Sequence, residues 1–591
     1  MKIITFFHER AKSIVRAAVR FPLVIIFLAT IAALLSIQIE SNQSQDFQKE
    51  ILTLMVGLFL SASVQVYLEK RKKPLSVFLI SQGGVLALTA VLYFLNVFNQ
   101  EGGGLMDGLR AIITSFILVI VFLWIPSIRW KASFNDVFMS AFKAFFTAGF
   151  FTAIIYGGLS LVLAAVNSLL FELPVNTFGH MAIWIWLIVA PVQVLALTPI
   201  FDGSEEEIEH ADKQSKCPAF LRVLLSFVLI PLTILYTVVL LSYLLKTIVS
   251  GDVQNLLEPL ILSYSIVVIL LYVLSSEIEN KISSIYLLVF PKIMALIALY
   301  QVVVSLAKMT EEGVTYGRYF VILFGIFSVV IGILMSILPK SKNHILAIVL
   351  TAFAVVSILP PVDVFTISIG SQTKVLQQVL EDNDMIVDGA IVPNESISDK
   401  DQGIITRAVE NLRDMNRLNM IEEMPDAFDF YRDFNGTFGF DPYYQDYMQF
   451  GGKSSYLSLD YEQPLDVEGY DYFLTMNGYD QQSASRSISV EAANGQTYTC
   501  ELVGGTDKID IVISDAAGME LLSASIVDKI DALTETEGSG GNEKMMTPEQ
   551  MTIEVEENGV AMRIILRYAG KNTYDSDTTY DTDMYILLRI T

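Results

Sequence analysis

The stretch that decides the fold reads YLLVFPKIMALIALYQVVVSLA over residues 286–307 and KMTEEGVTYGRY over residues 308–319. As a helix rising about 1.5 Å per residue, the first part is long enough to cross the roughly 30 Å hydrocarbon core of a bilayer. Its apolar run is interrupted near one end by Pro291-Lys292. The second part is a compact polar turn. The stretch therefore predicts a transmembrane helix that contains a charge and a turn that leads into the next helix.

Apolar segments of this length recur before residue 366. The chain has 591 residues, 53% of them hydrophobic and only 17% charged, whereas soluble domains average about 25% charged residues. Only helices and closed barrels satisfy the backbone polar groups within lipid. We therefore predict a polytopic protein with eleven transmembrane helices, at residues 21–39, 51–68, 75–97, 111–127, 145–171, 181–200, 222–248, 259–276, 285–307, 319–338 and 345–365.

The distribution of Lys and Arg orients these helices. With the N-terminus in the cytoplasm, the inner segments hold 18 Lys and Arg residues and the outer loops hold five. The positive-inside rule favours this orientation. Eleven crossings then place the C-terminal part outside the cytoplasm. We expect a bacterial inner membrane protein with a cytoplasmic N-terminus, and one missed or extra helix would reverse the side of the C-terminal part.

The composition changes after residue 365. Residues 366–591 hold 41 acidic and 15 basic residues, a balance of −26, and the rest of the chain has a balance of +2. We expect a transmembrane domain over residues 1–365, a helical stalk over 366–425 and a soluble extracytoplasmic domain over 426–591. The acidic field of this part should repel nucleic acid and anionic lipid.

The C-terminal part shows the pattern of antiparallel β-structure. Alternating apolar residues flank two Asn-Gly pairs, at residues 494–495 and 558–559, which is a strong hairpin signal. Residues 508–514 and 582–590 predict further strands, so the fold class is α-helical polytopic membrane protein with a C-terminal α+β, mainly antiparallel β, domain. Asp575, Asp577, Asp581 and Asp583 could supply oxygen ligands to calcium. They lack the Gly and Glu of an EF-hand, which favours a solvated loop.

The chain resembles a bacterial multi-pass family catalogued as domain of unknown function 4153. Three stretches carry the likeness, namely Pro218–Arg222 with Phe227–Leu232 and Tyr236, the turn Gly313–Tyr319, and Ile369–Gln372. The turn is similar to the Gly-x-Thr-x-x-Arg-Tyr pattern of that family. The resemblance implies a membrane core with a variable soluble tail, and it implies no known reaction.

Lys292, together with Pro291, is the first candidate site. A Lys within a membrane helix costs about 2.5–3.5 kcal/mol on insertion scales, and Pro291 removes a backbone donor and can kink the helix. The functional interpretation is a site for an ion, a proton or an anionic headgroup. The structural interpretation is a Lys that extends to the cytoplasmic headgroups, which lie about 10 Å away.

The polar turn is the second candidate. Thr315 and Arg318 could bind a phosphate or a carboxylate, because Arg presents a planar fork of donors. Alternatively, Glu311 or Glu312 pairs with Arg318 and the turn caps the following helix. The sequence leaves both interpretations open.

Enzyme motifs are absent from the sequence. It contains no GxSxG, HExxH or GxxxxGK[ST] pattern, and these are motifs of hydrolases, zinc proteases and nucleotide-binding proteins. Two distant cysteines and four scattered histidines predict neither a metal site nor a disulfide framework. We expect no cofactor, and the pattern favours a protein that is not an enzyme.

Three functional hypotheses follow. In the first, an envelope protein senses or binds a protein or glycan partner through its outer domain, while the bilayer surrounds its helical core. In the second, the protein transports an ion, a lipid or a small solute along a path that includes Lys292. In the third, it is a membrane transferase that acts on a lipid-linked substrate.

Overall fold

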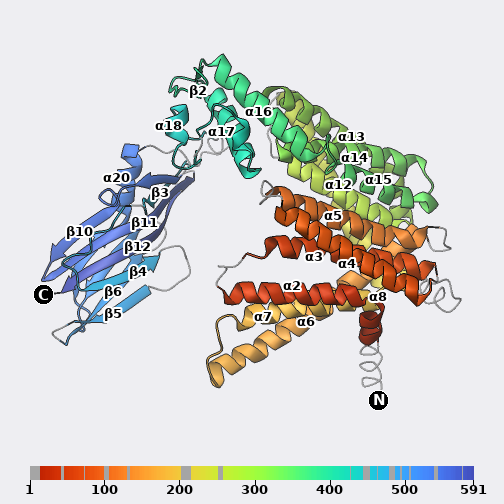
Figure 1. The fold of residues 1–591 in the computed structure, drawn as a ribbon, viewed down its shortest axis with the longest axis horizontal. Helices are drawn as coiled ribbons and strands as arrows, with labels where there is room; N and C mark the ends of the chain where they lie inside the picture. The colour runs from red at the N-terminus through yellow and green to blue at the C-terminus, as the bar shows by residue number, and fades with distance from the viewer. Residues whose placement is uncertain are drawn as a thin grey trace. The chain divides into compact units, whose positions relative to one another are not determined.

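The computed structural model describes residues 13–41, 46–71, 73–98, 105–128, 133–200, 214–250, 257–425, 428–443, 453–461, 463–477, 486–492, 495–504, 508–537, 543–574 and 577–590. The chain divides into two compact units. Unit 1 comprises residues 1–371 together with 414–416, and unit 2 comprises residues 372–413 and 417–591. Unit 1 is helical, and unit 2 contains the β-structure (Figure 1).

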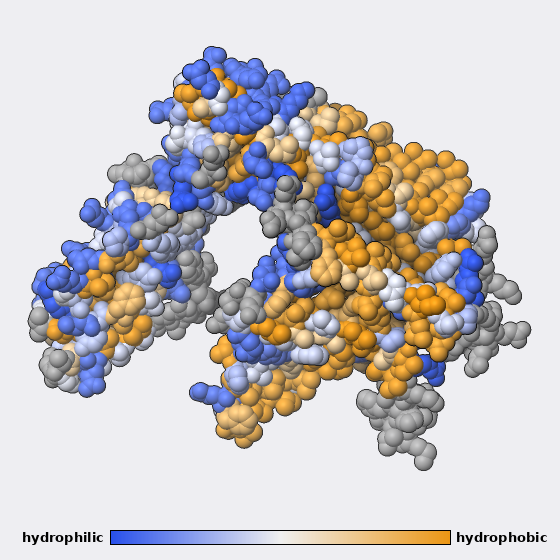
Figure 2. Space-filling view, in the orientation of Figure 1, coloured by the Kyte–Doolittle hydropathy of each residue, from blue (hydrophilic) through white to orange (hydrophobic). Residues whose placement is uncertain are grey.

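Unit 1 consists of long apolar helices. Nine helices within the described residues are long and apolar enough to cross a membrane, and Figure 2 shows apolar residues over much of their surface. They are α2 (Pro22–Glu40), α3 (Gln48–Lys70), α4 (Leu75–Phe98), α5 (Leu105–Trp124), α6 (Phe134–Leu169), α7 to α8 (Thr177–Leu197), α10 to α11 (Ala219–Ser250), α13 (Lys281–Glu312) and α14 (Tyr316–Ile337).

The remaining two expected spans are shorter. Residues 259–276 correspond to α12 (Leu257–Ser275), of which the apolar part Pro259–Ser275 is 17 residues long. Residues 345–365 correspond to α15 (His344–Val356), which has only 13 residues. Helix length therefore does not confirm the count of eleven.

Two of the long helices contain a π-helical segment with a local cause. The segments are η2 (Ile185–Val189) and η3 (Leu225–Leu229), and each is followed two residues later by a proline, Pro191 or Pro231. Proline has no N–H to donate to the carbonyl four residues earlier. That carbonyl lies inside each π segment, so the regular α ladder cannot continue through it.

Unit 2 begins with helices and continues into two sheets. Helix α16 (Val364–Asp382) begins in unit 1 and ends in unit 2. It is followed by the short strands β1 (Ile386–Val387) and β2 (Ala390–Ile391), then by α17 (Asp399–Asp414) and α18 (Phe434–Phe438). Phe430, Phe434, Phe438 and Phe440 are buried and pack on one another. These aromatic residues therefore form core.

The larger sheet has six strands. Its order is β4-β12-β11-β3-β9, and β10 also pairs with β11. The strands are β3 (Lys453–Leu459), β4 (Tyr472–Asn477), β9 (Glu543–Met546), β10 (Thr552–Glu557), β11 (Val560–Tyr574) and β12 (Asp577–Ile590). Among the strands that the structure describes, only β3 and β9 pair in parallel. The expected hairpin at Asn558-Gly559 is confirmed, with both residues at positive φ.

The smaller sheet has four antiparallel strands in the order β5-β6-β7-β8. They are β5 (Arg486–Glu491), β6 (Thr497–Gly504), β7 (Ile509–Ser514) and β8 (Glu520–Ser525), and α20 (Val527–Glu537) follows. The hairpin predicted around residues 494–495 is confirmed by the pairing of β5 with β6, although Asn494 lies outside the described residues. The aspartate-rich run is not the loop we expected, because residues 577–590 form β12. Asp575 lies outside the described residues.

Candidate functional site

The turn between α13 and α14 is closed by its own polar groups. Gly313 ends α13 with φ of 70°, a conformation that glycine adopts without steric cost. Thr315 is the N-cap of α14 and accepts a hydrogen bond from the backbone N–H of Arg318 at 3.2 Å. This contact satisfies one of the free N–H groups at the helix start.

The side chain of Arg318 is engaged within the same turn. It donates to the carboxylate of Glu312 at 2.8 Å and to the carbonyl of Gly313 at 2.9 Å. The Arg318 side chain is only 11% exposed. This geometry favours the capping interpretation over an anion site, because two of the guanidinium nitrogens already have acceptors. The side chain of Glu311 lies outside the described residues.

The start of α16 is hydrogen-bonded to this turn. The backbone N–H of Val314 donates to the hydroxyl of Ser371 at 2.8 Å, and the hydroxyl of Tyr319 donates to the carbonyl of Val362 at 2.6 Å. The fully buried Asp363 accepts from the N–H groups of Phe365 and Thr366 at 2.9 and 3.0 Å. A carboxylate at a helix start also interacts favourably with the helix dipole. We call these residues, 312–319 with 362–371, the α16 junction.

Lys292 and Pro291 lie on different faces of α13. Pro291 is buried, and its carbonyl oxygen would lie 2.6 Å from a Cβ added at Gly332 of α14. Lys292 is exposed on the surface of unit 1. An exposed Lys near one end of a membrane-length helix fits the headgroup interpretation. The structure therefore does not bring Lys292 together with Arg318 or with the other candidate residues.

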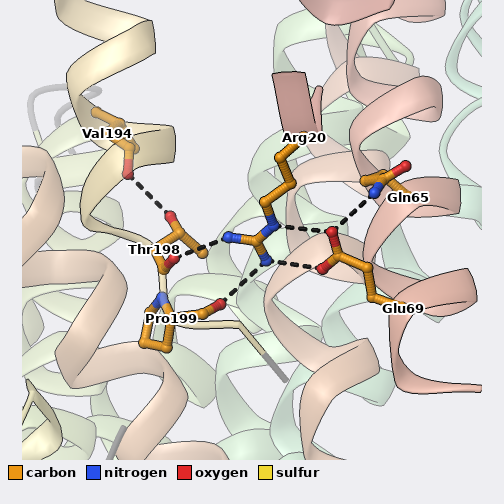
Figure 3. Close-up of polar contacts among 6 residues, drawn as sticks. All are labelled: Arg20, Gln65, Glu69, Val194, Thr198 and Pro199. Carbon is orange, nitrogen blue, oxygen red and sulfur yellow. Dashed lines mark hydrogen bonds and ion pairs between the residues drawn. The ribbon is translucent and has the colours of Figure 1, made fainter. Parts of the chain in front are cut away.

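A buried ion pair that the sequence did not single out joins three segments (Figure 3). Arg20 donates to both carboxylate oxygens of Glu69, each at 2.8 Å, and to the carbonyls of Thr198 and Pro199 at 2.9 and 3.1 Å. Gln65 also donates to Glu69 at 2.7 Å. The exposed fractions are 9% for the Arg20 side chain and 15% for the Glu69 side chain. In the sequence, Arg20 is one of the 18 Lys and Arg residues of the expected inner segments, and nothing marks it out from the others.

A second buried polar group connects loops at the same predicted end of the helices. Asn343 donates to Asn135 at 2.9 Å and to Ser276 at 3.3 Å, and Lys340 donates to the carbonyl of Ser276 at 3.1 Å. Asn135, Ser276 and Asn343 are all at least 96% buried. These contacts link the start of α6, the end of α12 and the loop before α15. Buried amides need such partners, so the network specifies how these ends pack.

A comparison with known protein families finds a match over the helical part of the chain. Residues 22–382 match the family described as Domain of unknown function (DUF4153), which is more than half of the sequence. The chain belongs to the DUF4153 family. No curated protein and no solved structure matches the chain.

The DUF4153 region ends at the last residue of α16, Asp382. It therefore contains the α16 junction and leaves out the β-rich part of unit 2. Two of the three stretches that carry the family likeness meet there, because Val314 of the turn bonds to Ser371 of the stretch Ile369–Gln372. Sequence reasoning identified both stretches but could not pair them, since 57 residues separate the bonded groups.

The third DUF4153 stretch surrounds the π segment η3. Ser226 is fully buried there, and its hydroxyl accepts a hydrogen bond from the side chain of Asn280 at 2.6 Å. Asn280 is also the N-cap of α13, accepting from the N–H of Ser283 at 2.7 Å. This polar contact fixes the widened part of α10 to α11 against the start of α13. No group of three or more His, Cys, Asp or Glu residues within the described ranges could hold a metal ion.

Proposed function

We propose that the protein is a bacterial inner membrane protein that binds an envelope partner through its extracytoplasmic C-terminal unit and transmits the bound state to the DUF4153 region. The observation that carries this proposal is the α16 junction. Helix α16 is continuous from unit 1 into unit 2, and its first half is hydrogen-bonded to the turn between α13 and α14. Because a helix is rigid, a displacement of the end of α16 that lies in unit 2 also displaces its first half and the turn to which that half is hydrogen-bonded.

The position of the family match supports this division of roles. The match covers the helical region and α16, and the β-rich part lies beyond it. This arrangement fits a common membrane core that carries a separate binding domain. Among the described residues, Lys292 is exposed and the carboxylates near the α16 junction serve as caps or ion pairs. Neither the transport hypothesis nor the transferase hypothesis gains a specific observation from these residues.

A truncation tests the proposal. A chain that stops after Asp382 keeps the whole family match. We expect it to insert into the membrane and to fail to complement a deletion strain. Ser371→Ala in the full-length chain should weaken complementation while membrane abundance stays unchanged, because it removes the contact with Val314. Ser396→Ala is the matched control. It also removes a serine hydroxyl, but from an exposed residue outside the α16 junction. Full complementation by the truncated chain would refute the proposal.

A further inference from the structure

An irregularity in β11 places an arginine on the outer face of the larger sheet. Leu566 pairs with Met584 and Tyr568 pairs with Asp583, so Arg567 has no residue opposite it and forms a β-bulge. A bulge adds one residue to a strand and redirects its side chains, and bulges are enriched next to functional sites. The Arg567 guanidinium lies over the ring of Tyr585 at 4.8 Å and pairs with Asp583 at 3.0 Å.

A cavity of about 420 Å³ adjoins this arginine. Its lining comes from β4, β5, the bulge and β12, and comprises Thr475, Met476, Asn477, Ser487, Ile488, Arg567 and Asp583. Pockets for small ligands have volumes of roughly 300–1,000 Å³. The cavity lies between β4 and β5, each of which is the edge strand of its own sheet. A hydrogen bond connects the two strands at one end, where the hydroxyl of Tyr472 donates to the carbonyl of Glu491 at 2.8 Å.

The chemistry of the lining selects a class of ligand. Arg567 and Asp583 together contribute no net charge, and Thr475, Asn477 and Ser487 supply hydroxyl and amide groups that both donate and accept. A free anion is disfavoured, because Asp583 already neutralises Arg567 and the chain beyond residue 365 has a balance of −26. A neutral ligand with many hydroxyl groups matches this mixture of donors and acceptors.

Exposed aromatic side chains support the same class. Phe473 is 55% exposed, and Tyr461, which lies beside Arg567, is 59% exposed. Phe473 packs beside Tyr585 at 5.0 Å between ring centroids. Because alternate residues of a strand share a face, Phe473, Thr475 and Asn477 lie on one face of β4. Aromatic rings stack on the C–H faces of sugars, while the neighbouring polar groups bind the hydroxyls.

Arg567 also carries an unsatisfied donor. Its Nε is buried and has no hydrogen-bond partner among the described residues. An unpaired buried donor costs about 1–3 kcal/mol, so its presence beside the cavity calls for an explanation. A ligand that reorients the guanidinium would relieve this cost.

We propose that the cavity between β4 and β5 binds a neutral oligosaccharide unit, with Arg567, Asp583, Asn477 and Thr475 holding its hydroxyl groups and Phe473 contacting its apolar face. The inference rests on the proposed role of the C-terminal unit as the binding unit. It names the class of ligand and does not require that binding be transmitted to the membrane.

The test is a binding measurement on the purified full-length protein in detergent. The probes are an array of neutral oligosaccharides, acidic oligosaccharides and short peptides, followed by titration of the tightest neutral oligosaccharide. We expect neutral oligosaccharides to be retained. We expect Arg567→Ala to weaken binding about tenfold or more and Thr475→Val, which removes a hydroxyl at nearly constant volume, to weaken it about fivefold.

Arg589→Ala is the matched control. Arg589 is an ion-paired arginine of β12, 40% exposed and not part of the cavity lining, so its loss should leave binding unchanged. Retention of only acidic oligosaccharides, of only peptides or of no probe would overturn the proposal. Equal affinities for the Thr475→Val, Arg567→Ala and Arg589→Ala variants would overturn it as well. If no sugar binding is found and the truncated chain still fails to complement, the oligosaccharide proposal is refuted and the proposed function stands.

Discussion

At the scale of single residues, the membrane region depends on a few buried polar contacts. Arg20 shows the principle most clearly, because it is charged, almost fully buried and shared by three segments. Removing one partner of a buried ion pair leaves the other charge without compensation, which costs more than the pair itself contributes.

Arg20→Ala should therefore destabilise the protein by about 3–5 kcal/mol. Arg16→Ala, one turn earlier and exposed, should have little effect. The measurement is thermal unfolding in detergent, followed by circular dichroism. The double variant Arg20→Met with Glu69→Leu should recover part of the loss, since it removes both charges. Equal unfolding temperatures for Arg20→Ala and Arg16→Ala would contradict this interpretation.

Asp581 provides a pH-dependent prediction for unit 2. Burial raises the pKa of its carboxyl above the ordinary value of 3.8, so the folded state favours the protonated form. When a carboxyl has a higher pKa in the folded state than in the unfolded state, the protein is less stable at pH values above the folded pKa. This stability is recovered as the pH falls through the folded pKa. Asp581→Asn should raise the unfolding temperature at pH 7, and the gain should shrink as the pH approaches 3.8.

The exposed Asp471→Asn serves as the control. It should change the unfolding temperature little at either pH, because its carboxylate is already in water. A stabilisation by Asp581→Asn that is the same at both pH values would show that burial of the charge is not its cause.

At the scale of elements, the contact between α13 and α14 depends on small residues. A Cβ at Gly332 would lie 2.6 Å from the carbonyl oxygen of Pro291 and 2.8 Å from the Cβ of Ala295. Small residues allow membrane helices to approach closely, and this close packing contributes to their association.

Gly332→Ala should destabilise the protein by about 1–3 kcal/mol, because overpacked contacts force neighbouring backbone to shift. Gly317→Ala lies on the same helix, where an added Cβ meets nothing within 4 Å. It should be neutral or slightly stabilising, since Ala favours the helix by about 1 kcal/mol relative to Gly. Unfolding in detergent measures both, and a stabilising Gly332→Ala would refute the packing argument.

Local patterns predicted many of these elements from the sequence. The hairpin at Asn558-Gly559 and the long apolar helices follow from turn chemistry and hydrophobicity, which act over a few residues. The short length of α15 did not follow, because apolar residues continue after Val356 while the helix ends. The bulge at Arg567 could not be predicted either, since it is a relation between two strands. For the same reason, the turn Gly313–Tyr319 and the stretch Ile369–Gln372 were both identified, but the hydrogen bond between Val314 and Ser371 was not.

At the scale of the whole molecule, the side of the membrane on which unit 2 lies depends on how many helices cross. Nine crossings and eleven crossings both place unit 2 opposite the N-terminus, and ten place it on the same side. Ten crossings result if only one of the two shorter helices, α12 and α15, crosses, and the hydrogen bonds around α14 bear on α15. Its helix is short, yet Val362 reaches Tyr319 at the start of α14, whereas Asn343 follows the end of α14. The chain from Asn343 to Val362 therefore runs back along α14, which supports a crossing.

The most direct measurement is side-specific labelling of two single cysteines with a membrane-impermeant maleimide, before and after the cells are opened. Ser341→Cys lies in the exposed turn before α15 and Ala517→Cys in an exposed turn of unit 2. Cys217 is replaced by Ser. Cys500 can stay, because it is fully buried and burial raises its pKa to about 12.

We predict that Ala517→Cys is labelled in intact cells and that Ser341→Cys is labelled only after they are opened. Labelling of both cysteines from the same side would mean that α15 does not cross the membrane, and unit 2 could not be the extracytoplasmic binding unit of this protein.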